Sequence, residues 1–502
     1  MNSLLNDLSP RVTDLPGSLA LIDEHIATRI ELYRILWDKN IGLEVDDSHI
    51  QEISKKREEI AKKIIKTPFN PANTFYEIYS STQNYRYMDV NLRIANYRNN
   101  NFSCKDVLFN KLPVNRNTWY PWLMSPAADD DSARKKIFDT FVTQLSGFKK
   151  LIEELFLLDS QILDELGLNY GKYFQAINGV SLDKVKSFLK AYLDGLKPYL
   201  PDLYRELTMN YFNREPKYYD DPWSLTLLAT RLLSESTRKS RDFFETVISF
   251  CKNMGYDLSK LTFDTEKREK KHSNAFCTWI KVPDDIRVSL HGRETFMDFY
   301  SVLHELGHAL HLTSTDPKLP PYKRYYGHFN MFLEVPSILF GEYLVSKQDF
   351  RVKFLGNETA EFTEAFTAQS KAYYLFSYPM LATLSLAKLR FFEKKCLGDV
   401  ETEFKRLNDK YFGIPLTSDF CYLIATAEGS FASSAVYIYS MGVMAGLAGK
   451  LAATHGEQWW EEPGAHEKLR SIWSNGPAIG EVLPAADPEE CRNWILEATG
   501  LQ

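Results

Sequence analysis

The stretch VLHELGHALHL, from Val302 to Leu312, places two histidines four residues apart, with a glutamate directly after the first. On a helix, His304 and His308 lie one turn apart on the same face, so their imidazole rings can converge on one ion. Imidazole nitrogens are ordinary zinc ligands, and Glu305 lies close enough to take a proton from a water at the metal. The pattern predicts a zinc site and its catalytic base on a helix over 293–313.

A short HExxH pattern also fits an amphipathic helix with exposed histidines, and a catalytic zinc needs a third protein ligand. A second expected helix, HFNMFLEVPSILFGEYL over 328–344, carries Glu334 among apolar residues. A buried charge needs a partner, which zinc would provide; a lysine, an arginine or a solvent-facing position are the alternatives. Pro336 predicts a kink beside Glu334. The missing side chain of Gly307 favours close approach of another backbone.

The composition of the chain bounds its class. It has 502 residues, 44% of them hydrophobic, and a formal charge of −6, which gives no general attraction to nucleic acid or to anionic membranes. No stretch has the length of a membrane-spanning segment, and the N-terminus lacks the features of a signal peptide. The six cysteines are scattered, which indicates reduced thiols. We therefore expect a cytoplasmic protein without nucleic-acid or membrane partners, and leave its oligomeric state open.

Helical periodicity dominates the sequence. It predicts an amphipathic hairpin of two helices over 19–40 and 46–67, and loops at 96–106 and around 113–128. The segment NAFCTWIKVPDDIRVSLHG (274–292) is rich in β-branched and aromatic residues around a polar turn, and it predicts two strands. Such a small sheet beside the zinc helix would allow an extended peptide to add as a further strand. Further helices are expected at 72–95, 130–165, 180–198, 222–254, 328–346, 357–395, 399–411 and 418–450.

Together, these residues resemble a known family. HELGHALH is followed by FLEVPS, with 334 − 308 = 26 positions from the second histidine to the glutamate. This resembles the thimet oligopeptidase and oligoendopeptidase F family of zinc metallopeptidases, of which the chain looks like a divergent member. Similar segments are FDTEKREKKHSNAFC (263–277), AVYIYSMGVMAG (435–446) and LRSIWSNGPAIGEVL (469–483), so the resemblance covers about 245–502.

The resemblance implies a mainly α, multi-helical, two-lobed zincin-like fold, with a small β-sheet beside the zinc helix and a substrate channel between the lobes. We expect a helical N-terminal lobe over 1–215 and a catalytic lobe over 216–502. The implied activity is that of a zinc metalloendopeptidase of the oligopeptidase type, which hydrolyses short unstructured peptides.

The resemblance also implies residue roles. One zinc ion per chain would be held by His304, His308 and Glu334, with Glu305 as general base. Tyr437 would donate its hydroxyl to the oxyanion of the tetrahedral intermediate. The residues expected to contact substrate are Ala275, Phe276, Cys277 and Tyr439. For the two tyrosines, a packing role with hydrogen-bonded hydroxyls is the alternative.

The sequence departs from the family pattern around the metal. Members usually carry a histidine shortly before the tyrosines, and the stretch 421–437 has none. The aspartate three residues before the ligand glutamate is Met331 here, and the glutamate seven after it is Gly341, although Glu342 follows. Two alternatives therefore stay open. One is a specialised metalloenzyme acting on a peptide-derived or carrier-bound metabolite, and the other is a non-catalytic binding protein.

Overall fold

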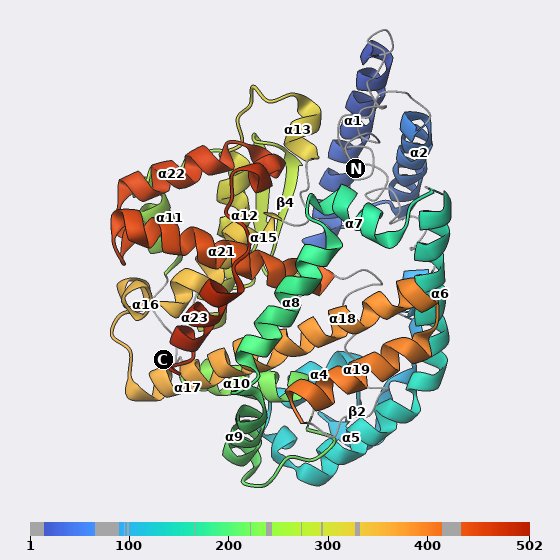
Figure 1. Cartoon of the computed structure of the whole chain (residues 1–502), viewed down its shortest axis with the longest axis vertical. Coiled ribbons are helices and arrows are strands. Elements are labelled where there is room, and N and C mark those ends of the chain that lie inside the picture. Colours follow the sequence, from blue (N-terminus) through green and yellow to red (C-terminus); the bar gives the residue numbers. More distant parts are fainter. Residues whose placement is uncertain are drawn as a thin grey trace.

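Helices form most of the structure, a computed structural model (Figure 1). It describes residues 15–65, 90–94, 96–97, 100–165, 167–220, 222–236, 243–272, 274–292, 295–326, 332–413 and 433–501. The α-helices are α1 Leu15–Asn40, α2 Asp47–Ile65, α4 Arg116–Leu123, α5 Asp131–Thr143, α6 Leu145–Glu165, α7 Tyr170–Asn178, α8 Leu182–Leu196, α9 Leu200–Phe212, α10 Pro222–Ser236, α11 Phe244–Asn253, α12 Phe296–Thr313, α13 Pro321–Tyr325, α15 Glu334–Ile338, α16 Gln348–Leu355, α17 Ala360–Ser370, α18 Tyr378–Lys394, α19 Leu397–Tyr411, α21 Ser433–His455, α22 Pro463–Trp473 and α23 Pro488–Ala498. Two π-helical segments, η3 Leu339–Leu344 and η4 Lys371–Ser377, continue α15 and α17. The mainly α, multi-helical fold class is confirmed.

A three-stranded sheet lies beside α12. Its strands are β3 Leu261–Asp264, β4 Phe276–Lys281 and β5 Asp285–Ser289, in the order β3-β5-β4. β4 pairs antiparallel with β5 and β3 pairs parallel with it, which leaves β4 at an edge. The two strands predicted over 274–292 are therefore confirmed, next to the helix that carries the two histidines.

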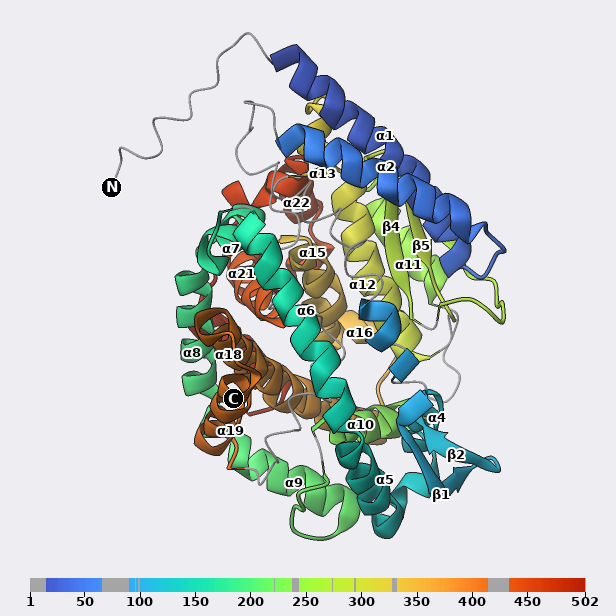
Figure 2. The same cartoon turned by 90° about the vertical axis from the view of Figure 1, so that its right-hand side faces the viewer.

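The predicted N-terminal helical hairpin is confirmed by α1 and α2, which lie side by side along the sheet (Figure 2). Aromatic side chains hold α1 against β4: the rings of Trp37 and Phe276 meet edge-on, with centroids 5.4 Å apart. Trp37, Ile41 and Ile280 form a small buried cluster separate from the main core. The hairpin therefore covers the outer side of the strand nearest the candidate site.

The prediction of loops at 96–106 and 113–128 was wrong in part. Strands β1 (Ser103–Phe109) and β2 (Leu112–Asn115) form a separate antiparallel pair, and α4 follows directly. Cys104 and Val114 face each other and are buried, and β1 contacts α5. Pro113 is tolerated because a two-stranded ribbon consists of edge strands only. Packing against α5 stabilises a pairing that the sequence pattern did not indicate.

Helix boundaries also differ from the expectation. The single helix predicted over 130–165 is two helices, α5 and α6, and α9, α22 and α23 were not expected. Residues 66–89 and 414–432, which carry much of the helix predicted over 72–95 and the start of that over 418–450, lie outside the described residues.

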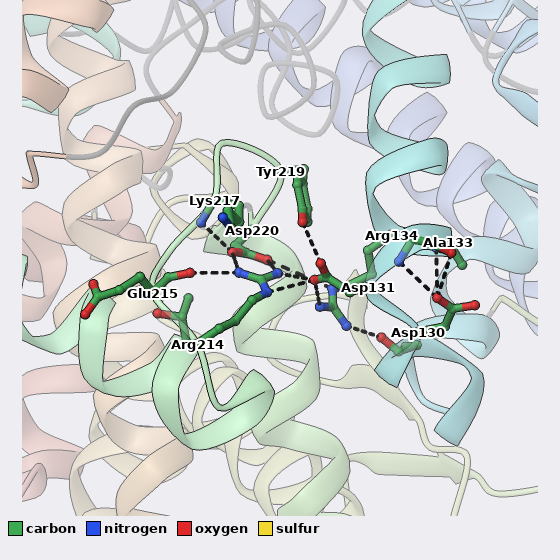
Figure 3. A network of polar contacts seen from close by, with 12 residues as sticks. Asp130, Asp131, Ala133, Arg134, Arg214, Glu215, Lys217, Tyr219 and Asp220 are labelled. Atoms are coloured by element: carbon green, nitrogen blue, oxygen red, sulfur yellow. Dashed lines mark hydrogen bonds and ion pairs between the residues drawn. The ribbon is translucent and has the colours of Figure 1, made fainter.

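A partly buried ion network ties α5 to the connection between α9 and α10 (Figure 3). The guanidinium of Arg214 donates to both carboxylate oxygens of Asp220, at 2.6 and 2.8 Å, and also to Asp131. Tyr219 donates to Asp131 at 2.7 Å. The predicted boundary between lobes, at 215/216, lies within this network and stays a prediction.

Helix α21 corrects the expectation that no segment has membrane-spanning length. Its residues Ser434–His455 are long and apolar enough to cross a membrane by length and composition, and within the described residues this is the one such helix. Two thirds of its most apolar window, 67%, is buried inside the protein, where it contacts α8, α15, α18 and α23. A core helix passes the same test, and α21 occupies the core.

Candidate metal centre

Helix α12 carries the two histidines in the predicted arrangement. Its first turn is fixed by a capping box, in which Thr295 accepts from the backbone of Asp298 and the Asp298 carboxylate accepts from the backbone of Thr295. One turn apart, the rings of His304 and His308 meet edge-on, with centroids 5.1 Å apart. A rigid, buried helix therefore presents both imidazoles on one face.

Glu334, in the first turn of α15, completes a group of three possible ligands. Its Oε2 lies 3.7 Å from Nε2 of His304 and 3.6 Å from Nε2 of His308. One ligand atom from each residue lies within 4.8 Å of the others. The Glu334 side chain is 27% exposed, so it is less buried than its apolar neighbours in the sequence suggested. The three predicted ligands are thus brought together, although Glu334 lies 26 positions beyond His308 along the chain.

Hydrogen bonds orient this group. Nδ1 of His308 lies 3.1 Å from the carbonyl of Leu333; because a carbonyl only accepts, Nδ1 carries the proton and Nε2 keeps its lone pair. Ser337 donates to Oε2 of Glu334 at 3.0 Å. Both contacts come from α15 or the residue before it, so the same segment that supplies the carboxylate also fixes one imidazole.

Two glycines allow α12 and the α15–η3 helix to touch. A methyl group on Gly307 would lie 2.4 Å from the carbonyl oxygen of Pro336, and one on Gly341 would lie 2.8 Å from Cβ of His304. Both distances are shorter than real contacts, so neither position accepts a side chain without moving a helix. The expectation that Gly307 permits close approach of another backbone is confirmed.

Glu305 lies between the metal group and the sheet. Its carboxylate lies close to the backbone of Cys277, and it feels the charges of His304 and Glu334. Burial raises the pKa of Glu305 above its ordinary value, with the charge of Glu334 acting in the same direction. The predicted base and one predicted substrate-contact residue are therefore neighbours.

Glu342 is a site residue whose position the sequence did not reveal. Its carboxylate is 1% exposed, and Oε1 lies 3.7 Å from Nδ1 of His304. Two hydroxyls donate to that same oxygen, Tyr300 at 2.5 Å and Tyr437 at 2.6 Å. The π-helical turn of η3 explains the placement, because it adds one residue per turn and carries position 342 to the face that position 341 would occupy in an α-helix.

The two tyrosines of α21 have different surroundings. Tyr437 donates to Glu342 and packs against Tyr378, with ring centroids 5.6 Å apart. Tyr439 packs edge-on against Phe188, with ring centroids 5.3 Å apart, and its hydroxyl lies close to the backbone of Ala486, so the described contacts do not bring it to the metal group. Ala275 directly precedes β4, and Phe276 is the first residue of that strand, next to Cys277. Met331 and residues 421–432 lie outside the described residues.

The two imidazoles have opposite pKa shifts. Burial and the charge of His304 lower the pKa of His308 to about 3. Burial also opposes protonation of His304, but the carboxylate of Glu342, with Glu305 and Glu334, outweighs it and raises the pKa to about 10. His304 thus sits among three carboxylates, a concentration of negative charge that suits a divalent cation.

No protein-family model matches the sequence, and no curated protein matches it. Solved structures do. The metallocarboxypeptidase 1 of Trypanosoma cruzi is 12% identical with a TM-score of 0.57, covering 96% of this chain and 99% of that one.

Two further structures are similar. The M32 carboxypeptidase of Deinococcus radiodurans R1 is 14% identical with a TM-score of 0.55, covering 97% and 100% of the two chains. A Bacillus anthracis protein assigned as an oligoendopeptidase F is 13% identical with a TM-score of 0.55, covering 92% and 83%. Over nearly its whole length, the chain therefore has the fold of these metallopeptidases.

Proposed function

We propose that the protein is a zinc-dependent metallopeptidase that hydrolyses short, unstructured peptides. The observation that carries this proposal is the convergence of His304, His308 and Glu334, with Glu305 beside them. The shared fold with metallopeptidases supports it. We further propose the thimet oligopeptidase and oligoendopeptidase F family, on the motifs of the sequence, and endopeptidase action.

The donor set fits zinc. Two imidazole nitrogens and one carboxylate oxygen are the ligands of several catalytic zinc sites, which keep a further position open. The proton on Nδ1 of His308 leaves Nε2 to coordinate, and Nε2 of His304 faces the same carboxylate oxygen. Bound zinc would lower the pKa of a water and polarise a carbonyl group.

The side chains around the ion would perform the proton transfers. Glu305 would take the proton of the attacking water and later pass it to the leaving amine. Its raised pKa favours this exchange, because a more basic carboxylate takes a proton from water more readily. The N–H of Cys277 would hold the carboxylate in place, and Tyr437 would stabilise the oxyanion after turning its hydroxyl from Glu342.

The test combines metal analysis with turnover. The purified protein should contain about one zinc ion per chain by mass spectrometry, and it should cleave quenched fluorescent peptides. The variant Glu305→Gln should keep the ion and lose cleavage, because Glu305 is no ligand. Loss of cleavage without loss of metal separates a hydrolase from a scaffold. Unchanged cleavage in Glu305→Gln would contradict the assignment of the base.

One observation favours a second candidate, a metalloenzyme specialised for one peptide-derived metabolite. The hydroxyl of Tyr437 donates its hydrogen bond to Glu342 at 2.6 Å. General peptide hydrolysis, by contrast, would need this hydroxyl to donate to the substrate. Bound zinc together with no cleavage across a broad peptide library would support this candidate over the first.

A further inference from the structure

The backbone of edge strand β4 presents alternate residues to its open side. On β5, the N–H groups of Ile286 and Leu290 bond the carbonyls of Lys260 and Asp264, so the even-numbered residues of β5 face β3. Its odd-numbered residues therefore face β4, where Arg287 pairs with Thr278 and Ser289 with Phe276. Because the direction alternates along a strand, Cys277 and Trp279 point their backbone groups outward.

Within the described residues, two of these outward-pointing backbone groups already have a neighbouring side chain. The backbone of Cys277 lies close to the carboxylate of Glu305, next to the metal group. The carbonyl of Trp279 accepts from Nη1 of Arg29, on α1, at 3.1 Å. Trp279 lies two residues, about 7 Å, beyond Cys277. The open edge of β4 therefore lies beside Glu305, the candidate base, at Cys277, and it is covered by the guanidinium of Arg29 at Trp279.

Arg29 is firmly held in this position. It is 4% exposed, and its guanidinium carbon lies 3.9 Å from the ring centroid of Tyr33, 5.6 Å from that of Trp279 and 5.1 Å from that of Tyr325. No carboxylate of the described residues lies within ion-pair distance of it. Aromatic faces and one carbonyl therefore stabilise the charge. A peptide N–H therefore does not easily displace the Arg29 guanidinium from the Trp279 carbonyl.

We propose that Arg29 is a specificity-determining residue that ends the peptide-binding edge of β4. This inference rests on the proposed function. Antiparallel pairing is the more stable mode of strand addition, so a substrate would run, from its N-terminus to its C-terminus, from Trp279 toward Cys277, with its N-terminal part beside Trp279. Backbone pairing then stops about two residues before the scissile bond, because the Trp279 carbonyl is already bonded. Longer N-terminal extensions gain no further strand hydrogen bonds.

Peptide binding tests this limit independently of turnover. The probes are fluorescein-labelled peptides with one to five residues before a fixed scissile bond, titrated by anisotropy against metal-loaded protein carrying Glu305→Gln. Affinity should rise from one residue to two and then stay level. Adding Arg29→Met, which keeps the aliphatic stem, should open the carbonyl and let the third residue raise affinity about threefold to tenfold.

Two further variants make the result specific. Arg29→Lys keeps a donor for the Trp279 carbonyl and should restore the plateau at two residues. Arg34→Met removes the same charge from an exposed position of α1 and should also keep that plateau. Thermal unfolding of each variant shows that α1 is still folded.

The outcomes separate the two proposals. The inference is overturned if the dependence of affinity on peptide length is the same with arginine and with methionine at position 29. It is also overturned if, with Arg29 in place, the third residue raises affinity as much as the second does. Failure of every peptide to bind overturns it too. If affinity depends on peptide length as predicted but the wild type cleaves no peptide, the inference about Arg29 holds and the proposed peptidase activity is wrong.

Discussion

The carboxylate of Glu342 lies 3.7 Å from Nδ1 of His304, while Nε2 of the same ring faces Glu334 at 3.7 Å. A carboxylate behind a metal-binding imidazole fixes the orientation of the ring and raises its basicity. Here the carboxylate is held in turn by Tyr300 and Tyr437. We infer that Glu342 is a positioning residue for His304.

Replacing Glu342 with glutamine should weaken zinc binding roughly 10- to 100-fold, the usual effect of removing such a partner. The amide has the same shape and can still accept from both tyrosine hydroxyls, so the fold should persist. Competition with a fluorescent chelator measures the affinity. Glu361→Gln, at an exposed position of α17, is the control, and equal affinity in both variants would contradict the role of Glu342.

Tyr300→Phe and Tyr437→Phe form a matched pair, because both hydroxyls donate to the same oxygen of Glu342. If Tyr437 also serves the oxyanion, its loss should lower kcat by about 10²–10³, and the loss of Tyr300 by far less. Both variants should lower zinc affinity to a similar, small extent. Equal values of kcat in Tyr300→Phe and Tyr437→Phe would show that Tyr437 only holds Glu342 and does not stabilise the oxyanion.

Glu334→Ala should remove most of the bound metal, because it deletes one of the three proposed ligands. We expect close to one zinc per chain in the wild type and well below that in the variant after dialysis, by mass spectrometry. The loss of affinity should exceed the roughly 10- to 100-fold effect expected for a residue that only supports a ligand. A full equivalent of zinc in Glu334→Ala would exclude this residue as a ligand.

Gly307→Ala should destabilise the protein by about 1–3 kcal/mol, as overpacking of a close contact does. The added methyl group would meet Pro336 at 2.4 Å and push apart the two helices that supply the ligands. Zinc affinity should fall with stability. Gly17→Ala provides the comparison, since nothing lies within 4 Å of the position, and its unfolding temperature should stay level or rise slightly.

His466 should make the protein sensitive to acid. Burial lowers its pKa to about 4, and its ring nitrogens contact Trp460 and Tyr256 at 2.9 and 3.0 Å. Below pH 6.5 the unfolded chain takes up a proton that the folded chain refuses, so stability is lost as the pH falls from 6.5 to about 4. The loss attributable to this residue is about 3 kcal/mol.

Urea unfolding at pH 7 and pH 5 checks this prediction. In His466→Gln, the free energy of unfolding should differ less between pH 7 and pH 5 than in the wild type, whatever the stability of the variant at pH 7. An unchanged difference would assign the acid sensitivity to other groups.

The sequence predicted the parts of the site that depend on local spacing. His304, Glu305 and His308 are fixed by one turn of helix, and Glu334 was identified because a carboxylate among apolar residues needs a partner. Glu342 was noticed only as the neighbour of Gly341. Glu342 lies in a π-helical segment, which has no reliable sequence signal, so the family pattern places the glutamate one residue earlier, at Gly341.

Tertiary packing accounts for the other differences. The β1–β2 ribbon contains Pro113 and is stabilised by α5, so its own residues predict a loop. Arg29 lies 250 positions from Trp279, and no local pattern in α1 indicates that its guanidinium reaches the edge of β4. Contacts of this kind follow from how distant helices come to rest on one sheet.

The burial of α21 has a consequence for biosynthesis. One of its partners, α23, is translated last among the described helices, so the apolar face that α23 covers stays in contact with water until α23 itself has been synthesised. A nascent protein in that state is prone to aggregation and is a natural client of chaperones. Truncations that delete α23 should therefore yield inclusion bodies, even though they leave every proposed zinc ligand intact.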